Sequence, residues 1–225
     1  MTYASAQGHV FLARDLSVPT AWTHEKPRGE GAGIPAARTL ATKPPRAQQR
    51  LPRAFDAGVP AAWVTGERVE GENRSRRRWL ETQAPAQVLA VSGQAYVWRA
   101  GRQHHGKTLR AGLGTEGWCR LSAGAGATGP RWEDWQWLAQ AAPRPRDWRR
   151  GLLVRRRLRD PPALTAYVVL APHAPPTLAT VVQVAGSRWT VERCVAEAKG
   201  EVGVEQDAVR RGTGWYRHRT FALGA

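Results

Sequence analysis

Short apolar runs bounded by glycine, proline or polar residues constrain the fold of this chain more than any other feature. Runs of about four to eight such residues are typical of buried strands, because helices usually extend over roughly ten residues or more. The expected strands lie at 9–14, 61–65, 88–91, 95–98, 151–154 and 166–170. Helical spacing of apolar residues predicts helices at 47–57, 72–82, 176–185 and 187–199. Because strands and helices are interspersed, the expected fold class is mixed α/β.

Three features depart from this pattern. Residues 23–46 are rich in proline and glycine and predict a loop. Pro52 lies inside the helix predicted at 47–57, where a proline costs about 3 kcal/mol. Residues 100–148 are rich in tryptophan, glycine and arginine, and they predict an irregular insertion of short strands and loops. The expected organisation is therefore a core at 1–99, an insertion at 100–148 and a continuation of the core at 149–225.

The net charge of the chain limits the classes of partner that it is expected to bind. The 225 residues include 34 lysines and arginines against 18 aspartates and glutamates, which gives a formal net charge of +16. Such an excess disfavours an enzyme of small metabolites and favours a polyanionic partner, with nucleic acid first. Most of the basic residues are arginines, and a GC-rich coding sequence would also favour arginine, so charge alone is weakly specific.

Cysteine usage and hydropathy predict the cellular compartment of the protein. Cys119 and Cys194 lie far apart and match no Cys-x-x-Cys spacing, so neither a disulfide framework nor a cysteine zinc site is indicated. Both are expected to be buried thiols in a reducing cytoplasm. No apolar run approaches the roughly 20 residues of a membrane span, and the first residues lack the basic and apolar regions of a signal peptide. The sequence predicts a cytoplasmic protein.

An acidic residue follows one of the predicted strands. Glu67 comes directly after the apolar run that ends at Gly66. Its carboxylate would therefore lie at the C-terminal edge of a sheet, where α/β proteins build their sites. An ordinary solvated turn would explain the same pattern.

A second candidate group lies on the predicted helix at 187–199. Arg188, Glu192 and Lys199 are spaced so that they share one helix face. The apolar positions Val191, Val195, Ala198 and Val202 would form an adjacent stripe that holds this helix against a core. The polar face would then have a fixed orientation, as a metal-binding carboxylate requires. The alternative is a ladder of surface ion pairs.

Several separated blocks of the sequence resemble the DDE transposases of bacterial insertion sequences. The blocks are 63–71, 124–131 and 188–216, and the resemblance extends from about residue 3 to residue 225. The branch related to insertion sequence four has the late signature Tyr-x2-Arg-x3-Glu-x6-Lys. Arg188, Glu192 and Lys199 match its last three positions, whereas Ala185 stands at the tyrosine position. The closing run at 214–218, Gly-Trp-Tyr-Arg-His, is also similar to that family.

The resemblance implies a ribonuclease H-like mixed sheet with flanking helices and a β-rich insertion, incomplete at both ends. In this family two aspartates and a glutamate hold two Mg²⁺ ions, about 3.5–4 Å apart, against a phosphodiester. The reaction implied is hydrolytic nicking at the ends of the element, followed by attack of the freed 3′-hydroxyl on target DNA. By resemblance, Glu192 is the family's glutamate, Glu67 occupies the second aspartate position, and Arg188 and Lys199 contact DNA.

This chain departs from the family at its acids. Glu67 is one methylene longer than aspartate, and a misplacement of about 1 Å can cost roughly 100-fold in rate. The first aspartate has no counterpart, and Asp15 is interpreted as structural. We therefore expect a truncated and inactive transposase, which would be nucleoid-associated, would bind transposon ends and target DNA, and would self-associate on DNA. The alternatives are a non-catalytic basic DNA-binding remnant and a decaying reading frame without function.

Some lesser candidates remain. A tryptophan of the 100–148 segment would stack on an unpaired base or pack in a core, and the candidates are Trp118, Trp132, Trp135 and Trp137. His104 and His105 have no nearby third ligand, so a solvated loop is expected there. The basic runs at 74–78, 144–150 and 155–157 would contact phosphates or form solvated faces.

Overall fold

The computed structural model describes residues 1–16, 18, 26–35, 43–83, 85–99, 102–140, 148–158, 163–172, 177–206 and 211–224. The chain forms two compact units. Unit 1 comprises residues 1–57 and 189–225, and unit 2 comprises residues 58–188. Helix α7 (Leu178–Gly200) begins in unit 2 and ends in unit 1. Within the described ranges, no helix combines the length and the apolar content that crossing a membrane requires.

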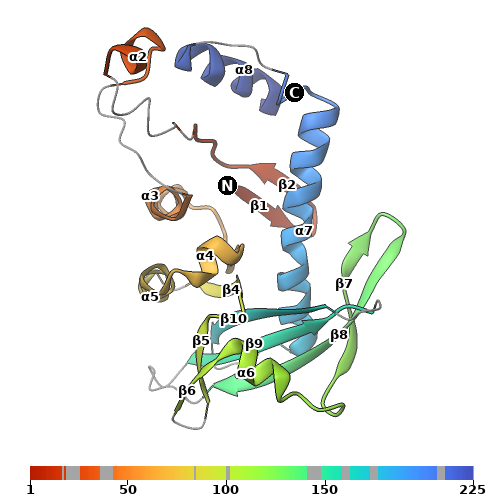
Figure 1. Ribbon diagram of the computed structural model, residues 1–225. Helices are drawn as coiled ribbons and strands as arrows, with labels where there is room; N and C mark the ends of the chain where they lie inside the picture. Colours follow the sequence, from red (N-terminus) through yellow and green to blue (C-terminus); the bar gives the residue numbers. More distant parts are fainter. Residues whose placement is uncertain are drawn as a thin grey trace. The chain divides into compact units, whose positions relative to one another are not determined.

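Unit 2 is built on one mixed sheet of six strands (Figure 1). The order across the sheet is β3 (Trp63–Gly66), β4 (Ala86–Val91), β10 (Leu164–Pro172), β9 (Trp148–Arg156), β8 (Gly129–Gln140) and β7 (Cys119–Gly126). Strands β3 and β4 are parallel, and the other neighbours pair antiparallel. A parallel pair needs a crossover, and here it consists of α4 (Arg68–Glu72) and α5 (Arg74–Thr82).

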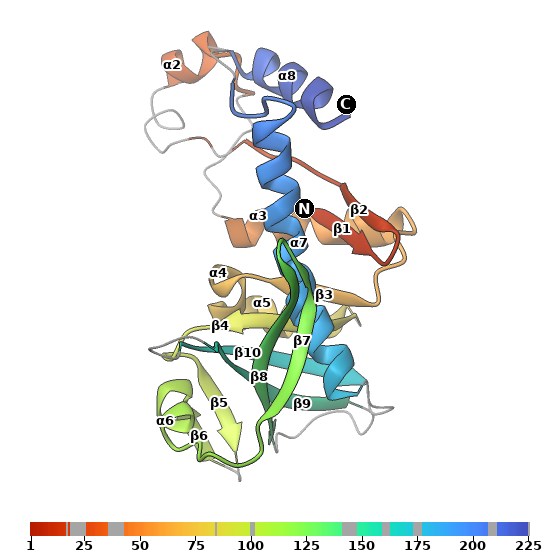
Figure 2. The same cartoon turned by 90° about the vertical axis from the view of Figure 1, so that its right-hand side faces the viewer.

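The central strands are apolar on both faces, as expected of strands that are covered on both sides. One face packs against the first half of α7, and its buried residues include Val88, Leu153, Val169 and Val182. The opposite face packs against the hairpin of β5 (Tyr96–Arg99) and β6 (Arg102–His105) and against α6 (Gly106–Ala111), which Figure 2 shows below the sheet. The buried residues of this second core include Val97, Leu109, Leu152 and Val168.

Close approaches at glycine fix the packing of unit 2. A Cβ at Gly186 on α7 would lie 2.0 Å from the carbonyl oxygen of Ala123 on β7. On β9, a Cβ at Gly151 would lie 2.0 Å from Cζ2 of Trp137, so the indole occupies the space that any side chain there would need. Because neither contact leaves room for a methyl group, glycine is required at both positions.

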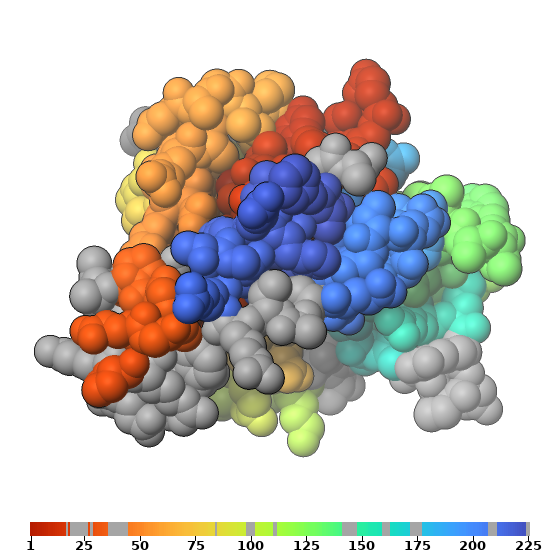
Figure 3. Space-filling model, turned by 90° about the horizontal axis from the view of Figure 1, so that it is seen from above, coloured from red at the N-terminus to blue at the C-terminus, as the bar shows by residue number. Residues whose placement is uncertain are grey.

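Unit 1 holds the two ends of the described chain. It contains the hairpin of β1 (Thr2–Ser5) and β2 (Gly8–Phe11), helices α2 (Lys26–Gly31) and α3 (Lys43–Asp56), the second half of α7, and α8 (Gly212–Gly224). The Gly212 N–H donates to the Ala32 carbonyl, and Figure 3 shows α2 in orange beside α8 in dark blue. Asp15 lies 3.1 Å from Arg46 and 3.5 Å from Arg50 of α3. These contacts give Asp15 the structural role expected from the sequence.

The mixed α/β class expected from the sequence is confirmed, and most expected elements are present with shifted ends. The helix expected at 47–57 is α3, which continues through Pro52. The prediction of a loop at 23–46 is wrong at α2 and at the start of α3. Residues 23–25 and 36–42 of this segment lie outside the described ranges. The expected helix at 72–82 is divided into α4 and α5, whereas the two helices expected at 176–199 form the single helix α7.

The segment at 100–148 contains longer strands than its sequence suggests. Strand β8 has 12 residues, and β7 and β8 both pair into the six-stranded sheet. The two compact units also divide the chain differently from the expected boundaries at 99 and 148. Cys194 is buried as expected, but Cys119 is exposed on β7, so the expectation of two buried thiols is wrong at that position.

Candidate nucleic-acid site

Glu67 stands where the sequence placed it, directly after β3. Its backbone is extended (φ −75°, ψ 177°) and forms the N-cap of α4. Its carbonyl accepts hydrogen bonds from the N–H groups of Glu70 and Gly71. The backbone on both sides is therefore fixed, by β3 before Glu67 and by α4 after it. The side chain is 57% exposed and extends from the C-terminal end of the parallel strand pair.

The carboxylate of Glu67 faces Arg188. Nη1 of Arg188 donates to Oε1 of Glu67 over 3.4 Å, which joins residues 121 positions apart in the chain. Both groups lie in unit 2. An exposed pair of this kind contributes only about 0.2–1 kcal/mol, because water screens both charges. The contact therefore positions the two side chains but does not lock them together.

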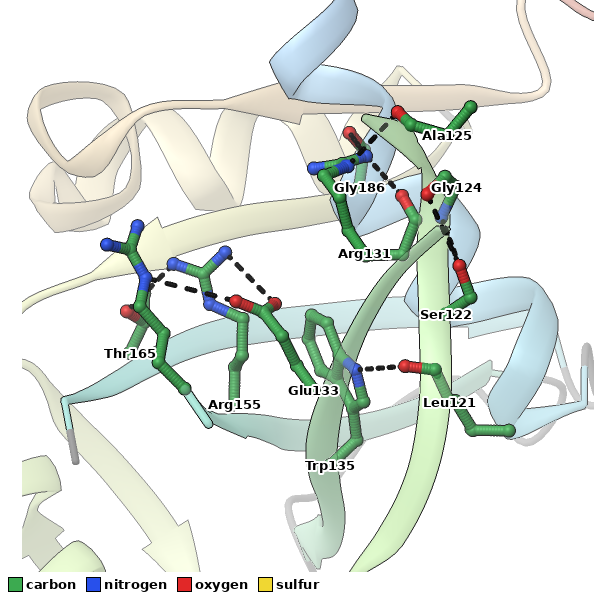
Figure 4. Close-up of polar contacts among 12 residues, drawn as sticks. Leu121, Ser122, Gly124, Ala125, Arg131, Glu133, Trp135, Arg155, Thr165 and Gly186 are labelled. Atoms are coloured by element: carbon green, nitrogen blue, oxygen red, sulfur yellow. Dashed lines mark hydrogen bonds and ion pairs between the residues drawn. The ribbon is translucent and has the colours of Figure 1, made fainter. Parts of the chain in front are cut away.

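A second set of charges surrounds Tyr167 on the face of the sheet that packs against α7. Tyr167 is buried, and burial raises the pKa of its phenol, although the positive charges of Arg155 and Arg188 oppose the increase. The guanidinium of Arg155 lies 5.9 Å from the centre of its ring. Glu133 pairs with Arg155 at 3.5 Å and with Arg157 at 3.9 Å (Figure 4).

The sequence analysis missed Glu133 and Tyr167 as members of this region. Glu133 lies on β8, Arg155 on β9 and Tyr167 on β10, and the register of these three strands brings them together. The only available signal was that an acid and an arginine occupy positions of neighbouring strands whose side chains point to the same face of the sheet. That signal becomes useful only when the pairing register is known.

Arg131 fixes the end of β8 against α7. Its guanidinium donates to the carbonyls of Ala123 and Gly186, the latter over 3.0 Å (Figure 4). Nε1 of Trp135 donates to the Leu121 carbonyl over 3.3 Å. The bond from Arg131 to Gly186 holds the β7–β8 hairpin on the helix two residues before Arg188, so the position of Arg188 in unit 2 is set by the hairpin as well as by the sheet.

Glu192 and Lys199 belong to the part of α7 in unit 1. Both side chains are exposed. Nζ of Lys199 lies 2.5 Å from Glu205, a partner that the sequence analysis did not propose. Glu192 follows Arg188 by one helical turn, about 6 Å along the axis.

The apolar stripe expected beside these residues is partly wrong. Val195 is 36% exposed, whereas Cys194 and Ala198 are buried. The buried face of α7 in unit 1 thus follows positions 194 and 198, and Val195 belongs to the exposed face with Glu192 and Lys199. A helix buries positions three or four apart, and at this point Cys194 takes the place given to Val195.

The residues around Glu67 do not fit a magnesium ion. Mg²⁺ prefers several hard oxygen ligands in a near-octahedral arrangement. Within unit 2, Glu67 faces the guanidinium of Arg188, and positive charge repels a cation. Among the described residues, no group of three His, Cys, Asp or Glu side chains is arranged to hold a metal.

The tryptophans and histidines that the sequence analysis considered differ in their burial and in their contacts. Trp135 is fully buried, Trp137 is half-buried in the core against α7, and Trp132 is 54% exposed. The guanidinium of Arg156 lies 4.3 Å from the ring centre of Trp118. His105 contacts the Tyr96 ring, with 4.2 Å between the centroids.

Of the expected basic runs, 74–78 lies on α5, and 155–157 includes the partners of Glu133. Residues 144–147 of the third run lie outside the described ranges. No family model matches the chain, and a search of curated proteins finds no match.

Proposed function

We propose that this chain is a DNA-binding protein of the DDE transposase type, built on a ribonuclease H-like core. The observation that carries the proposal is the contact between Glu67 and Arg188. These residues come from two separate blocks of the resemblance, and Glu67 lies at the C-terminal end of a parallel strand, where α/β folds build their sites. DNA from transposon ends or targets is the proposed partner, and a nucleoid-associated location follows from it.

The proposed chemistry is recognition of phosphate by guanidinium. Arg188 offers a planar fork of N–H donors, which suits two phosphate oxygens. Its pair with Glu67 is exposed and weak, so an incoming phosphate displaces the carboxylate at low cost. The +16 charge of the chain would add attraction that is independent of sequence. Lys199 is the second proposed DNA contact.

Metal-dependent strand cleavage is the activity that the resemblance implies for Glu67 and Glu192. The donor set at Glu67 does not support it, because the carboxylate faces a positive charge. Binding without cleavage is therefore the proposed activity. A Mg²⁺-dependent nicking activity on element-end DNA that disappears in Glu192→Ala would contradict this part of the proposal.

Salt-dependent binding tests the proposal. Fluorescence anisotropy with a labelled duplex gives the slope of log Kobs against log salt, which reports the phosphates neutralised. Arg188→Gln should reduce the magnitude of that slope by about 1. Arg193→Gln is the matched control, because it removes the same charge from the same helix on another face, where Arg193 pairs with Glu197 at 2.8 Å. Equal effects of the two substitutions would overturn the assignment.

A further inference from the structure

A cavity of about 520 Å³ lies in unit 2 beside the second core. It is lined by α5, by the turn after β4, by β5 and by the ends of β8 and β9, and two residues of the second core, Val97 and Val168, contribute to its wall. Figure 1 shows α5, β5 and β6 on the left side of this unit, with α5 above β5 and β6. The volume falls within the range of about 300–1,000 Å³ that is typical of small-molecule sites.

Four arginines line this cavity, and they repel one another. Arg74, Arg77 and Arg78 come from α5, and Arg150 comes from β9. Burial is the largest cause, and the neighbouring charges of Arg77, Arg78 and Arg74 add to it, so that the pKa of Arg150 is lowered to about 10. Groups held together against such repulsion are stabilised when an anion binds between them.

The position of these arginines on α5 adds to the unfavourable electrostatic energy. Arg74, Arg77 and Arg78 lie in the first turns of the helix, where the macrodipole favours negative charge, and α5 has no acid in its first turn. Arg74 also shares a helix face with Arg77 and Arg78, so like charges are three and four residues apart. The helix therefore presents uncompensated positive charge to the cavity.

Both glutamates of the cavity wall already pair with an arginine. Glu81 pairs with Arg150, and Glu72 lies 3.6 Å from Arg68. Among the described residues, neither Arg74 nor Arg78 has a carboxylate within ion-pair distance. Four guanidinium groups against two carboxylates leave the cavity wall with a net positive charge.

The remaining wall offers a flat aromatic surface and amides. Tyr96 is 51% exposed, and its ring is supported by His105 at 4.2 Å between centroids. Three glutamines, Gln94, Gln103 and Gln140, also line the cavity. Each amide supplies a donor and an acceptor, and Nε2 of Gln140 is buried without a hydrogen-bond partner among the described residues. An exposed ring beside amides and guanidinium groups suits a base attached to a phosphate.

We propose that this cavity binds a nucleoside phosphate, with the phosphate between the arginines of α5 and the base against Tyr96. The ligand is either a free nucleotide or the 5′-phosphorylated end of a DNA strand, which share this chemistry. The inference does not depend on the proposed function, because the second core lies on the face of the sheet opposite α7 and Arg188.

Calorimetric titration of the whole chain with adenosine 5′-monophosphate, adenosine and inorganic phosphate tests the proposal. Only the monophosphate should bind with full affinity. Equal binding of adenosine would overturn the role of the arginines, and equal binding of inorganic phosphate would overturn the role of Tyr96. A short 5′-phosphorylated single strand then identifies the source. If it competes with the nucleotide, the ligand is a strand end, whereas a strand that does not compete leaves the free nucleotide as the ligand.

Substitutions locate the binding. The exposed pair Arg74→Gln and Arg78→Gln together should weaken nucleotide binding at least about tenfold, because hydrogen bonds between charged groups are lost. Tyr96→Leu should weaken binding of the monophosphate but leave any residual binding of inorganic phosphate unchanged. Arg53→Gln, an exposed arginine on α3 in unit 1, is the matched control and should change binding less than about twofold.

Arg188→Gln separates this inference from the proposed function. It should weaken binding to duplex DNA and leave nucleotide binding unchanged. If the double arginine substitution leaves nucleotide binding unchanged, or if Arg53→Gln reduces it equally, the nucleotide is not bound in this cavity and the inference is overturned. Far-ultraviolet circular dichroism of each variant checks that the chain remains folded, as expected for substitutions at the exposed Arg53, Arg74 and Arg78.

Discussion

Gly186 packs against the carbonyl oxygen of Ala123 so closely that a Cβ would lie 2.0 Å from that oxygen. The contact joins α7 to β7, and Arg131 reinforces it by donating to both carbonyls. Both Gly186 and Ala123 are buried, and neither side of the contact is a flexible side chain that could move aside. The packing of α7 against the β7–β8 hairpin in unit 2 therefore requires glycine at position 186.

Replacing Gly186 by alanine should destabilise the chain, because the added methyl group requires a shift of the backbone. The expected cost is about 1–3 kcal/mol. Gly200→Ala on the same helix is the control, since a Cβ there meets nothing within 4 Å. Alanine at that position should leave stability unchanged or raise it by up to about 1 kcal/mol. Thermal unfolding followed by circular dichroism measures both, and equal effects would contradict the packing argument.

Pro52→Ala should stabilise the chain. Pro52 lies inside α3, where its ring removes a backbone hydrogen bond and crowds the preceding turn. A gain of about 1–3 kcal/mol is expected. Pro45→Ala is the control, because Pro45 lies in the first turn of the same helix, where proline is tolerated. A denaturant midpoint for Pro52→Ala at or below that of the parent chain would refute the prediction.

Asp134 should make stability depend on pH. Hydrogen bonds from Arg120 at 3.0 Å and Arg156 at 2.9 Å lower the pKa of this buried carboxyl below 3.8. A carboxyl with a depressed pKa adds stability above the pKa of the unfolded chain, and this stability is lost as pH falls through the lower pKa of the folded chain. Asp134→Asn should therefore cost about 1–3 kcal/mol at neutral pH.

The difference between Asp134→Asn and the parent chain should shrink as pH decreases from about 4 towards 2. Denaturant unfolding at a series of pH values measures it. The exposed Asp56 provides the control substitution Asp56→Asn, which should produce no comparable pH-dependent difference. A difference that stays constant over this range would show that the charge of Asp134 is not responsible.

Glu81→Gln should destabilise unit 2, because it leaves Arg150 next to three other arginines without its carboxylate partner. Breaking a partly buried pair of this kind costs about 3–5 kcal/mol. Added phosphate should recover part of the loss by screening the arginines. Glu116→Gln, at an exposed position, is the control. The prediction fails if phosphate stabilises both variants equally.

The sequence predicted the elements that carry Glu67 and Arg188 because each depends on a local signal. The apolar run before Gly66 has the length of a strand, and the spacing around Arg188 is helical. Their contact across 121 residues was not predicted, because neither the local pattern nor the resemblance pairs these two side chains. The position of Glu192 relative to Glu67 stays a prediction.

Features that depend on the strand register could not be predicted. Glu133, Arg155 and Tyr167 meet only because β8, β9 and β10 pair in one alignment. The break expected between the helices at 176–185 and 187–199 is absent, because Gly186 serves the contact with Ala123 and does not end a helix. The cavity arginines likewise combine a local run on α5 with Arg150, whose place depends on the sheet.

The indole of Trp137 over Gly151 has a consequence for how the sheet assembles. A shift of one residue between β8 and β9 would bring Arg150 or Leu152 under the ring, where there is no space for either. The same shift would exchange the faces of Leu153 and its neighbours, because side chains alternate along a strand. One missing side chain therefore excludes the misaligned pairings that two long, apolar strands could otherwise adopt during folding.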